Sequence, residues 1–551
     1  MKTHYLEYIH NSIVTAWNMP ALTNYKKNSF TYGEIAQQVA RHHILFEKLG
    51  LKKGDKVALC GPNSAEWGIA FLAVTSYEAV AVPLLNDFLP ESVMTLTDHS
   101  ESRLFFVSND IWEKTDIARM PLLELVMSLE DNNVLFSKDN AVKEAYASLD
   151  TLFKEKYPEG FGPEQVSYPT DNFDDLALIN YTSGTTSAPK GVMLTYRSIS
   201  SNIQFGQSEM PNGPGDTLVS MLPMAHMYGM AFEYLYQLAG GTQVFFLGKV
   251  PSPKVLLDAL ATVKPYMLIT VPLVIEKIFK SSVFPTIRKP MVKSIMKIPG
   301  LASVIYKQIR KKLLHAFGGR IRTIVIGGAA INQEVEDLMK AVKLPYTVGY
   351  GMTECGPLLS YEDTRKFVKG SCGKPVHRMS LRIDSDDPRA IVGEIQARGD
   401  NVMLGYYKNP EATAAAFTKD GWLRTGDLGL MDKDNNFFIK GRSKNLIIGA
   451  NGQNIYPEEI EDKLNNQPYV VESIVVERDK KLVALVFPDY DRVSQESLDS
   501  MNLAQLMEDN RMRLNMLLPV FSRIHKIELL PEAFEKTPKR SIKRFLYQEV
   551  K

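Results

Sequence analysis

Three short apolar segments of this 551-residue chain end in glycine or small polar residues. Residues 177–181 precede Thr-Ser-Gly-Thr-Thr, residues 322–326 precede Gly-Gly-Ala-Ala, and residues 346–350 precede Gly-Met-Thr-Glu. In an open sheet of parallel strands, ligands bind beyond the carboxyl ends of the strands. The three endings therefore predict one shared ligand site in an α/β fold.

Strand-like and helix-like patterns alternate in the first part of the chain. Phe30–Leu49 has helical spacing and stops at Gly50. The next segments read as strand, helix, strand and strand: Asp55–Leu59, Glu66–Tyr77, Ala79–Leu85 and Leu104–Val107. This order is typical of α/β layers around a largely parallel sheet. The pattern is weaker from about 110 to 175, where we expect excursions from the core.

The sequence pattern changes after residue 392. Gly393–Ala397, Val402–Tyr407 and Phe437–Lys440 read as short strands of a small β-rich subdomain. Beyond about 445 we expect the helix Pro457–Asn465 and a hairpin of Val470–Glu477 and Leu482–Phe487. The prediction is a large α/β N-terminal domain with layered, mostly parallel sheets (1–440), a hinge (441–444) and a small mobile α+β C-terminal domain (445–551).

Composition excludes several classes of protein. The chain has 64 Lys and Arg against 63 Asp and Glu, which argues against a whole-chain nucleic-acid footprint. Three scattered cysteines exclude a disulfide framework and a Cys-rich zinc site. The N-terminus lacks a secretion signal, so we expect a cytoplasmic protein. His226, Glu233 and Gln237 interrupt the apolar stretch 218–247, which we interpret as a buried helix followed by a buried strand.

The segment Tyr181–Val192 combines two glycines, five serine and threonine residues and Lys190 directly after a strand. Glycine lets backbone N–H groups approach a phosphate, hydroxyls donate to phosphate oxygens or bind Mg²⁺, and lysine adds charge. The segment is not a Walker loop, because the Gly-Lys-Ser/Thr ending is missing. The alternative is a flexible surface turn, but this order of residue types favours a phosphate loop.

This loop resembles the signature of the AMP-forming adenylating enzymes, which include acyl-CoA synthetases, luciferases and peptide-synthetase adenylation domains. The resemblance covers nearly the whole chain and is closest to long-chain fatty acid–CoA ligases. Ser187 departs from it, standing where the family commonly has glycine. The further matching motifs are Gly327–Ala330, Tyr350–Glu354, Gly421–Asp427, Gly441–Lys444 and Gly449–Glu461.

The resemblance implies a two-step reaction with ATP, Mg²⁺ and coenzyme A. A carboxylate attacks the α-phosphate to give acyl-AMP, and a thiol then displaces AMP. Lys190 and Thr185 are the implied catalytic groups of the loop, and Thr185 with Glu354 would hold the metal. Glu354 has a second interpretation, a helix N-terminal acid stabilised by the helix dipole. The implied phosphate-binding residues are Thr182, Ser183, Gly184, Thr185, Thr186 and Lys190.

Other motifs are implied to hold the nucleoside. Gly328, Ala329 and Ala330 would form the adenine turn, and Asp427 with Arg442 would bind the ribose. Tyr350 would stack on the base, with an ordinary core tyrosine as the alternative. Without the resemblance, Asp427 would be interpreted as part of a Gly-Asp turn. The resemblance also assigns Gly351, Met352 and Thr353 to the nucleotide site, with Thr353 donating to the α-phosphate.

Three further residues match positions around the acyl and thiol sites. Lys444 stands at the hinge about which the small domain rotates, and its alternative is a solvated lysine. Gly452 lies in a loop that would contact coenzyme A, or would be a simple turn. His226 would line the acyl pocket.

One expected residue is missing. The family ends with a lysine that bridges the acyl carboxylate and phosphate, and Ser541 stands in its place. Three accounts stay open. Lys539 or Lys543 supplies the charge, or Ser541 leaves a slow adenylating enzyme that still forms thioesters, or the chain binds acyl groups and nucleotides without turnover.

The predicted substrate is a long-chain fatty acid, because residues 271–279 and the long insert before Gly318 resemble the corresponding parts of long-chain acyl-CoA synthetases.

 The alternatives are another carboxylic acid or a carrier-protein thiol as acceptor. Residues 277–320 carry eleven Lys and Arg and no Asp or Glu, interleaved with apolar residues. This pattern is typical of a helix on a membrane surface, here the inner membrane face, and also of a solvated basic face. We expect no nucleic-acid partner, and the oligomeric state stays open.

Overall fold

A computed structural model describes residues 3–182, 189–248, 252–298, 300–449, 453–537 and 541–548. The candidate residues Ser183, Gly184, Thr185, Thr186, Gly452 and Lys539 lie outside these ranges. Among the described residues, no helix is both long and apolar enough to cross a membrane. The cysteines Cys60, Cys355 and Cys372 are all buried, and none of them forms a disulfide.

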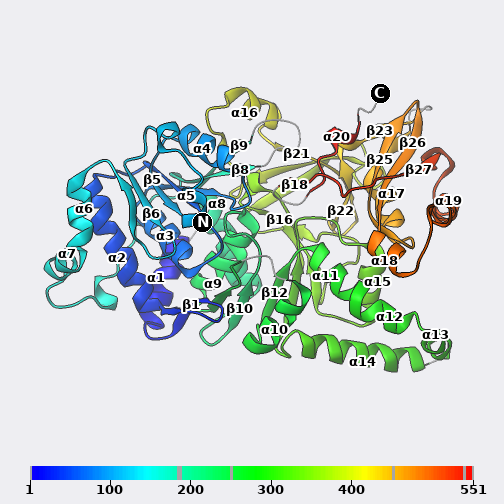
Figure 1. The fold of residues 1–551 in the computed structure, drawn as a ribbon, viewed down its shortest axis with the longest axis horizontal. Helices are drawn as coiled ribbons and strands as arrows, with labels where there is room; N and C mark the ends of the chain where they lie inside the picture. The colour runs from blue at the N-terminus through cyan, green and yellow to red at the C-terminus, as the bar shows by residue number, and fades with distance from the viewer. Residues whose placement is uncertain are drawn as a thin grey trace.

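An eight-stranded sheet forms the centre of the N-terminal half (Figure 1). Five neighbouring strands run parallel. At one edge β9 pairs antiparallel with the outermost of these five and β20 pairs antiparallel with β9, and at the other edge β7 is added by an antiparallel pairing. The prediction of a largely parallel α/β sheet is confirmed, and the weakly patterned region after residue 110 contributes the last two strands of the sheet, of which the outer one is an edge strand. In sheet order the strands are β20 (Gly405–Tyr406), β9 (Lys190–Thr195), β8 (Leu176–Thr182), β4 (Val80–Leu84), β3 (Lys56–Cys60), β5 (Ser102–Val107), β6 (Leu125–Ser128) and β7 (Val134–Ser137).

The helices of this half begin and end where local chemistry requires. Helix α2 (Tyr32–Leu49) starts with a capping box in which Thr31 accepts from the Glu34 N–H, and it stops at Gly50 with φ of 66°. Glycine adopts this left-handed conformation without a Cβ penalty, which is why the helix ends there. The other helices are α1 (Tyr5–Thr15), α3 (Ala65–Ser76), α4 (Pro90–His99), α5 (Asn109–Trp112), α6 (Asn140–Ala147), α7 (Leu149–Lys156) and α8 (Tyr196–Glu209).

Two smaller sheets continue the N-terminal half. One has the order β10 (Thr217–Ser220), β11 (Gln243–Phe246), β1 (Pro20–Asn24) and β2 (Ser29–Thr31). The other is wholly parallel, with β12 (Met267–Thr270), β13 (Thr323–Ile326) and β14 (Tyr346–Val348). Their helices are α9 (Tyr236–Ala239), α10 (Pro253–Val263), α11 (Pro272–Ile278), α12 (Phe284–Ile287), α13 (Pro290–Met296), α14 (Leu301–Ala316) and α15 (Gln333–Ala341).

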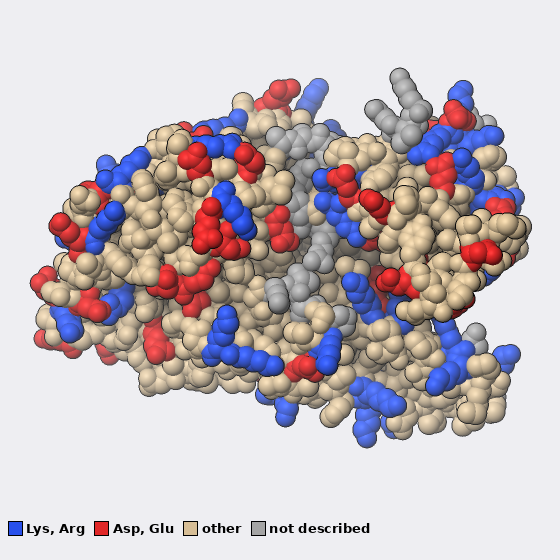
Figure 2. Space-filling model, viewed as in Figure 1, with Lys and Arg blue, Asp and Glu red and all other residues tan. Residues whose placement is uncertain are grey.

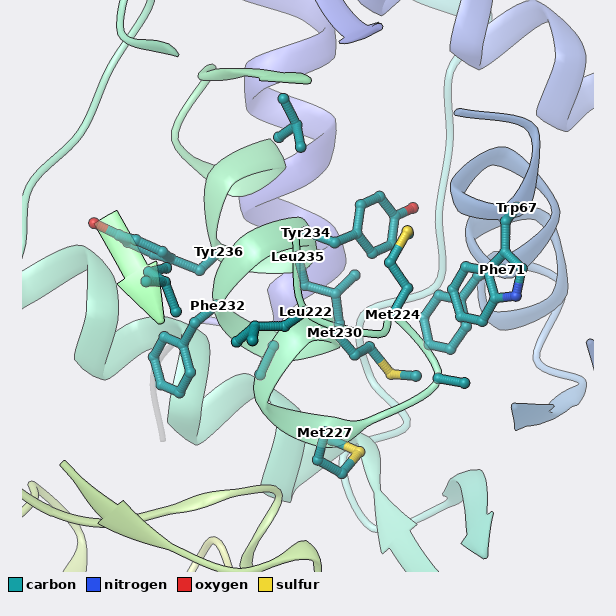
Figure 3. Packing of buried hydrophobic residues seen from close by; sticks show 14 of the residues in the cluster. Trp67, Phe71, Leu222, Met224, Met227, Met230, Phe232, Tyr234, Leu235 and Tyr236 are labelled. Carbon is teal, nitrogen blue, oxygen red and sulfur yellow. The ribbon is translucent and has the colours of Figure 1, made fainter. Parts of the chain in front are cut away.

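The apolar stretch 218–247 contains the predicted buried helix followed by a buried strand, which are the π-helix η3 (Gly229–Leu235) with α9, and then β11. It also opens within strand β10, which was not predicted. Figure 3 shows how its side chains pack against α3. Tyr234 donates to the Gly68 carbonyl at 2.7 Å, and its ring lies edge-on to Phe71. Burial on every side hides the helical period, so the pattern did not show that the first residues of the stretch belong to a strand.

The predicted β-rich subdomain is present. It contains the antiparallel sheet β18 (Met379–Asp384), β19 (Gly393–Gly399), β21 (Leu423–Met431) and β22 (Phe437–Arg442), with α16 (Pro410–Ala416) beside it. The expected strand 346–350 is divided, because β14 ends at Val348 and Tyr350 begins another sheet. That sheet is β15 (Tyr350–Gly351), β16 (Leu358–Tyr361) and β17 (Lys374–Pro375). Of the expected strand 402–407, only Gly405–Tyr406 is extended in a ladder.

The C-terminal unit has its own apolar cores (Figure 1). The predicted helix and hairpin are confirmed as α17 (Pro457–Leu464), β25 (Val470–Arg478) and β26 (Lys481–Pro488). Polar contacts join the unit to the rest: Lys440 pairs with Glu459 at 3.0 Å, and Asn332 donates to Asp462 at 3.0 Å. The remaining elements are β23 (Ile447–Ile448), β24 (Asn454–Ile455), β27 (Lys526–Leu529), α18 (Tyr490–Gln495), α19 (Ser500–Met516) and α20 (Phe545–Gln548).

Candidate active site

The predicted phosphate loop connects two paired strands. Thr182 at the end of β8 lies opposite Lys190 at the start of β9. The Thr182 hydroxyl donates to the Lys190 carbonyl at 3.5 Å, so the ladder holds the two flanks of the loop together. This pairing fixes where Lys190 enters the site.

Lys190 and Glu354 meet at Tyr406. The Tyr406 hydroxyl donates to Glu354 Oε1 at 2.9 Å, and Lys190 Nζ lies 4.9 Å from the centre of the Tyr406 ring. An ammonium over an aromatic face is held by cation–π attraction. Burial, and then the charge of Glu354, raise the pKa of Tyr406 well above its usual value. The tyrosine therefore stays protonated and continues to donate to the carboxylate.

Asp427, Arg442 and Tyr350 form a second group. The register of β21 and β22 sets Asp427 directly opposite Arg442, and Arg442 Nε lies 3.1 Å from Asp427 Oδ1. The Tyr350 hydroxyl donates to the other oxygen, Oδ2, at 2.8 Å. Burial raises the pKa of Asp427, while Arg442 and Tyr350 oppose that rise. The carboxylate is thus buried, oriented and bonded through both oxygens.

The two groups lie within electrostatic reach of each other. The charge of Glu354 contributes to the raised pKa of Asp427. Lys444, in the 3₁₀ turn η6 (Ser443–Asn445), has its pKa lowered by partial burial and then by the charges of Arg442 and Lys190. Residues from four distant parts of the sequence therefore gather in one charged neighbourhood, which can hold a polyanion between cations.

The glycine turn after β13 is open. Gly328 has φ of 88°, a conformation that favours glycine, and Ala329 and Ala330 are exposed. Tyr228 packs against Gly327, where an added Cβ would lie 3.1 Å from its ring, and donates to the Val325 carbonyl at 3.2 Å. Small side chains on an exposed turn leave room for a flat group to approach the backbone.

The segment around His226 is held by a buried acid. His226 Nδ1 accepts from the Tyr228 backbone N–H at 3.2 Å. Glu233 Oε2 accepts from the Ser220 hydroxyl at 2.9 Å and from the N–H groups of Met221 and Leu222 at 3.0 and 2.9 Å. Burial raises the pKa of Glu233 to about 8, against these hydrogen bonds. The acid thus anchors the turn that leads to His226.

The other predicted residues of the Tyr350–Glu354 motif lie beside the Asp427 group. Gly351 is exposed and pairs with Leu358 in the ladder between β15 and β16. Met352 is half-buried and Thr353 is buried at the start of the 3₁₀ turn η5 (Thr353–Cys355). The turn brings Glu354 toward Tyr406.

The described residues of the C-terminal run 536–544 contact one another and other parts of the C-terminal domain. The Thr537 N–H donates to the Ser541 carbonyl at 2.8 Å, and Lys543 Nζ pairs with Glu535 at 3.2 Å. Arg544 pairs with the buried Glu461. Ser541 is exposed. Of the two lysines proposed to replace the missing one, Lys543 therefore has an ion-pair partner within the tail.

Sequence reasoning missed three residues of this site: Tyr406, Tyr228 and Glu233. Tyr406 joins the site because β20 pairs with β9, more than 200 residues earlier. Tyr228 contacts the glycine turn from a segment 97 residues before Val325, to which its hydroxyl donates. For Glu233 the available signal was an acidic residue within an apolar stretch, because a buried acid needs polar partners.

Comparison with known proteins agrees with this geometry. A family model described as AMP-binding enzyme matches residues 12–407, and one for the AMP-binding enzyme C-terminal domain matches residues 444–549. A long-chain-fatty-acid–CoA ligase, FadD15 of Mycobacterium bovis, is 30% identical, over 81% of this chain and 75% of its own length. A 4-coumarate–CoA ligase of Vanilla planifolia is 29% identical, over 81% and 76%.

The fold is shared with solved structures. The crystal structure of ATP-bound MatB from Rhodopseudomonas palustris superposes with a TM-score of 0.76, at 22% identity, and the match covers 99% of this chain and 98% of that one. The two family models together cover most of the chain. Lys190 and Glu354 lie within the first match, and Asp427 and Arg442 lie between the two matches. The protein belongs to the AMP-binding enzyme family of adenylating acid–CoA ligases.

Proposed function

We propose that the protein activates a long-chain fatty acid with ATP through acyl-AMP and transfers the acyl group to the thiol of coenzyme A. The observation that carries this proposal is the convergence of Lys190, Glu354, Asp427 and Arg442 in one neighbourhood. An acid must approach a polyanion there, and fixed cations lower the cost of that approach.

Each group has a proposed role that fits its setting. Lys190, with the 182–186 loop, holds the outer phosphates, and Asp427 accepts from the ribose hydroxyls while Arg442 donates nearby. Glu354 offers a hard oxygen ligand for Mg²⁺, together with Thr185 and phosphate oxygens. Gly328, Ala329 and Ala330 receive the adenine, and Tyr350 orients Asp427 through its hydroxyl.

Two observations support a long-chain acid. The relative FadD15 is named for that substrate. In addition, Met224, Met227 and Met230 cluster around the segment that carries His226 (Figure 3). Methionine is flexible and polarisable, so a methionine-rich wall adapts to an alkyl chain. His226 would lie at the carboxyl end of that chain.

The test is a chain-length series. Pure protein is incubated with ATP, Mg²⁺ and fatty acids of increasing length, with and without coenzyme A, and AMP and thioester are followed. Because each buried CH₂ is worth about 0.8 kcal/mol, kcat/KM should rise roughly fourfold per added methylene until the slot is full. The proposed substrate class is wrong if 4-coumarate or another aromatic acid is the best substrate.

Ser541 favours a second candidate, an acyl- and nucleotide-binding protein without useful adenylation. Loss of one preorganised donor costs about 2.7–4 kcal/mol in other enzymes, or roughly 10²–10³ in rate. ATP binding by calorimetry, without AMP formation under any of the conditions above, would select this candidate over the ligase.

A further inference from the structure

The segment 277–320, here called the basic edge, forms one border of the molecule. It runs from the end of α11 through α12 and α13 to α14 and beyond (Figure 1, lower edge). Lys and Arg side chains project from this border in Figure 2. The segment contains eleven such residues and no Asp or Glu, so its field has one sign.

Most of this charge is not neutralised locally. Arg288 pairs with Glu334 of α15 at 2.7 Å. Among the described side chains of the basic edge, no other lysine or arginine makes an ion pair. On α14, Lys307, Lys311 and Lys312 are exposed, while Ile309 and Leu313 on the opposite side are buried against the core. Because the apolar side of the helix packs against the core, its cationic side faces solvent.

Large apolar side chains are exposed beside these cations. The side chains of Met291, Val304, Ile298 and Leu301 are 72%, 54%, 51% and 40% exposed. All four lie within fourteen residues, at the corner where α13 turns into α14. Exposed methionine, isoleucine, leucine and valine so close together have a cost in water, which burial in an apolar medium removes.

We propose that the basic edge docks on an anionic lipid bilayer, with the α13–α14 corner inserted into the headgroup region. Anionic headgroups attract the lysines, and the acyl boundary accepts Met291, Ile298 and Val304. A nucleic acid would satisfy the charge but not the apolar corner, so the bilayer explains both observations.

The basic edge is joined to the candidate active site. Helix α11 begins right after Val271, whose Cγ1 lies 3.6 Å from where a Cβ on Gly328 would be. Glu276 of the same helix accepts from the Asn332 N–H at 3.0 Å, at the start of α15. A docked edge would place this side of the site near the membrane, where a poorly soluble acid is dissolved. That delivery role rests on the proposed function, whereas the docking itself does not.

Vesicle sedimentation tests the docking with the full chain and without ATP. The protein should sediment with phosphatidylglycerol–phosphatidylcholine vesicles but not with pure phosphatidylcholine. Raising the salt from roughly 0.05 M to 0.5 M should release it, because screening shortens the reach of the charges. Equal sedimentation with neutral vesicles, or none with anionic ones, would overturn the proposal.

Variants locate the surface. Lys311→Glu with Lys312→Glu should weaken vesicle binding at least tenfold, and Met291→Ser with Val304→Ser about as much. Lys419→Glu with Lys433→Glu, and Met501→Ser, are matched exposed controls on other elements and should bind like the parent. Circular dichroism checks folding. Unchanged binding of both basic-edge variants, or binding of an RNA oligonucleotide in place of vesicles, contradicts the assignment.

A ligase assay without vesicles, run with the whole chain-length series of acids, separates the two proposals. Vesicle binding without AMP formation from any of these acids would leave the docking surface standing and remove the proposed function. AMP formation without vesicle binding would support the proposed function and remove the docking surface.

Discussion

Asp427 combines features that a carboxylate needs for binding hydroxyl groups. It is buried, bonded to Tyr350 through one oxygen and to Arg442 through the other, and opposite Arg442 in the ladder. Both partners limit its rotation, so its lone pairs point in fixed directions. A ligand that replaces water at this carboxylate finds an acceptor that is already oriented.

Replacing Asp427 with asparagine should lower kcat/KM for ATP roughly 10- to 100-fold. A hydrogen bond to a charged group is worth about 1.5–3 kcal/mol, and the amide keeps the shape but loses the charge. The readout is AMP formation at subsaturating ATP. Asp434→Asn is the control, on an exposed turn of the same subdomain, and an equal effect in both variants would remove the ribose role of Asp427.

Glu233 should make stability depend on pH. Its pKa is about 8 in the folded protein and near 4.5 when exposed. The folded form holds its proton more tightly, so its contribution is complete below pH of about 4.5 and is lost as the pH rises to about 8. The loss is about 1.4 kcal/mol per pH unit over that window.

Glu233→Gln removes this dependence while keeping the shape of the protonated acid. The variant should gain melting temperature relative to the parent as the pH is raised from about 5 to 8. Thermal melts at several pH values provide the measurement, with exposed Glu411→Gln as the control. A constant difference between Glu233→Gln and the parent at all pH values would show that Glu233 is ionised throughout.

At the scale of elements, the C-terminal tail is attached to α17 by one buried ion pair. Arg544 contacts Glu461, which also accepts from the Val475 N–H of β25. The side chains are 19% and 8% exposed. Tail, helix and sheet thus share one carboxylate, and this attachment sets the position of Ser541 three residues earlier.

Arg544→Ala should destabilise the C-terminal domain by about 3–5 kcal/mol, because Glu461 would remain buried without its partner. Lys543→Ala removes an exposed pair on the same element and should cost less than about 1 kcal/mol. Denaturant unfolding of the two variants measures the difference. Similar losses in both would mean that the Arg544 pair is solvated.

At the scale of the whole molecule, the proposed adenylation would use groups from both domains. Lys190 and Glu354 belong to the N-terminal domain, and the tail that would deliver a further cation belongs to the C-terminal domain. Asn332 and Asp462 connect the two units at 3.0 Å, close to the glycine turn. Burial raises the pKa of Asp462 to about 6, which reflects how closely the units pack at this contact.

If Lys539 or Lys543 replaces the missing lysine, its alanine variant should slow acyl-AMP formation by about 10²–10³. Ser541→Lys introduced into that variant should restore the rate, because it returns the charge to its expected place. Pyrophosphate release in single turnovers reports the adenylation step. An unchanged rate in the Lys539→Ala, Lys543→Ala double variant would show that neither lysine supplies the charge.

Local patterns were enough to predict many elements. Helix α2 with its stop at Gly50, and the hairpin of β25 and β26, follow from apolar spacing and turn residues that are close in sequence. The glycine motifs likewise predicted which strand ends carry polar groups. The apolar stretch 218–247 contains the predicted buried helix and the strand after it, but its opening strand β10 was missed, since burial on all sides removes the period that separates strand from helix.

The sequence by itself determined the α/β class, the order of the elements and the residue types offered to a ligand, because neighbouring residues set these properties. The tertiary structure alone decided that Tyr406 joins Lys190 to Glu354, that Glu233 holds the turn before His226, and that Lys543 pairs within the tail. Such contacts depend on strand register and on packing between distant segments, which no local pattern encodes.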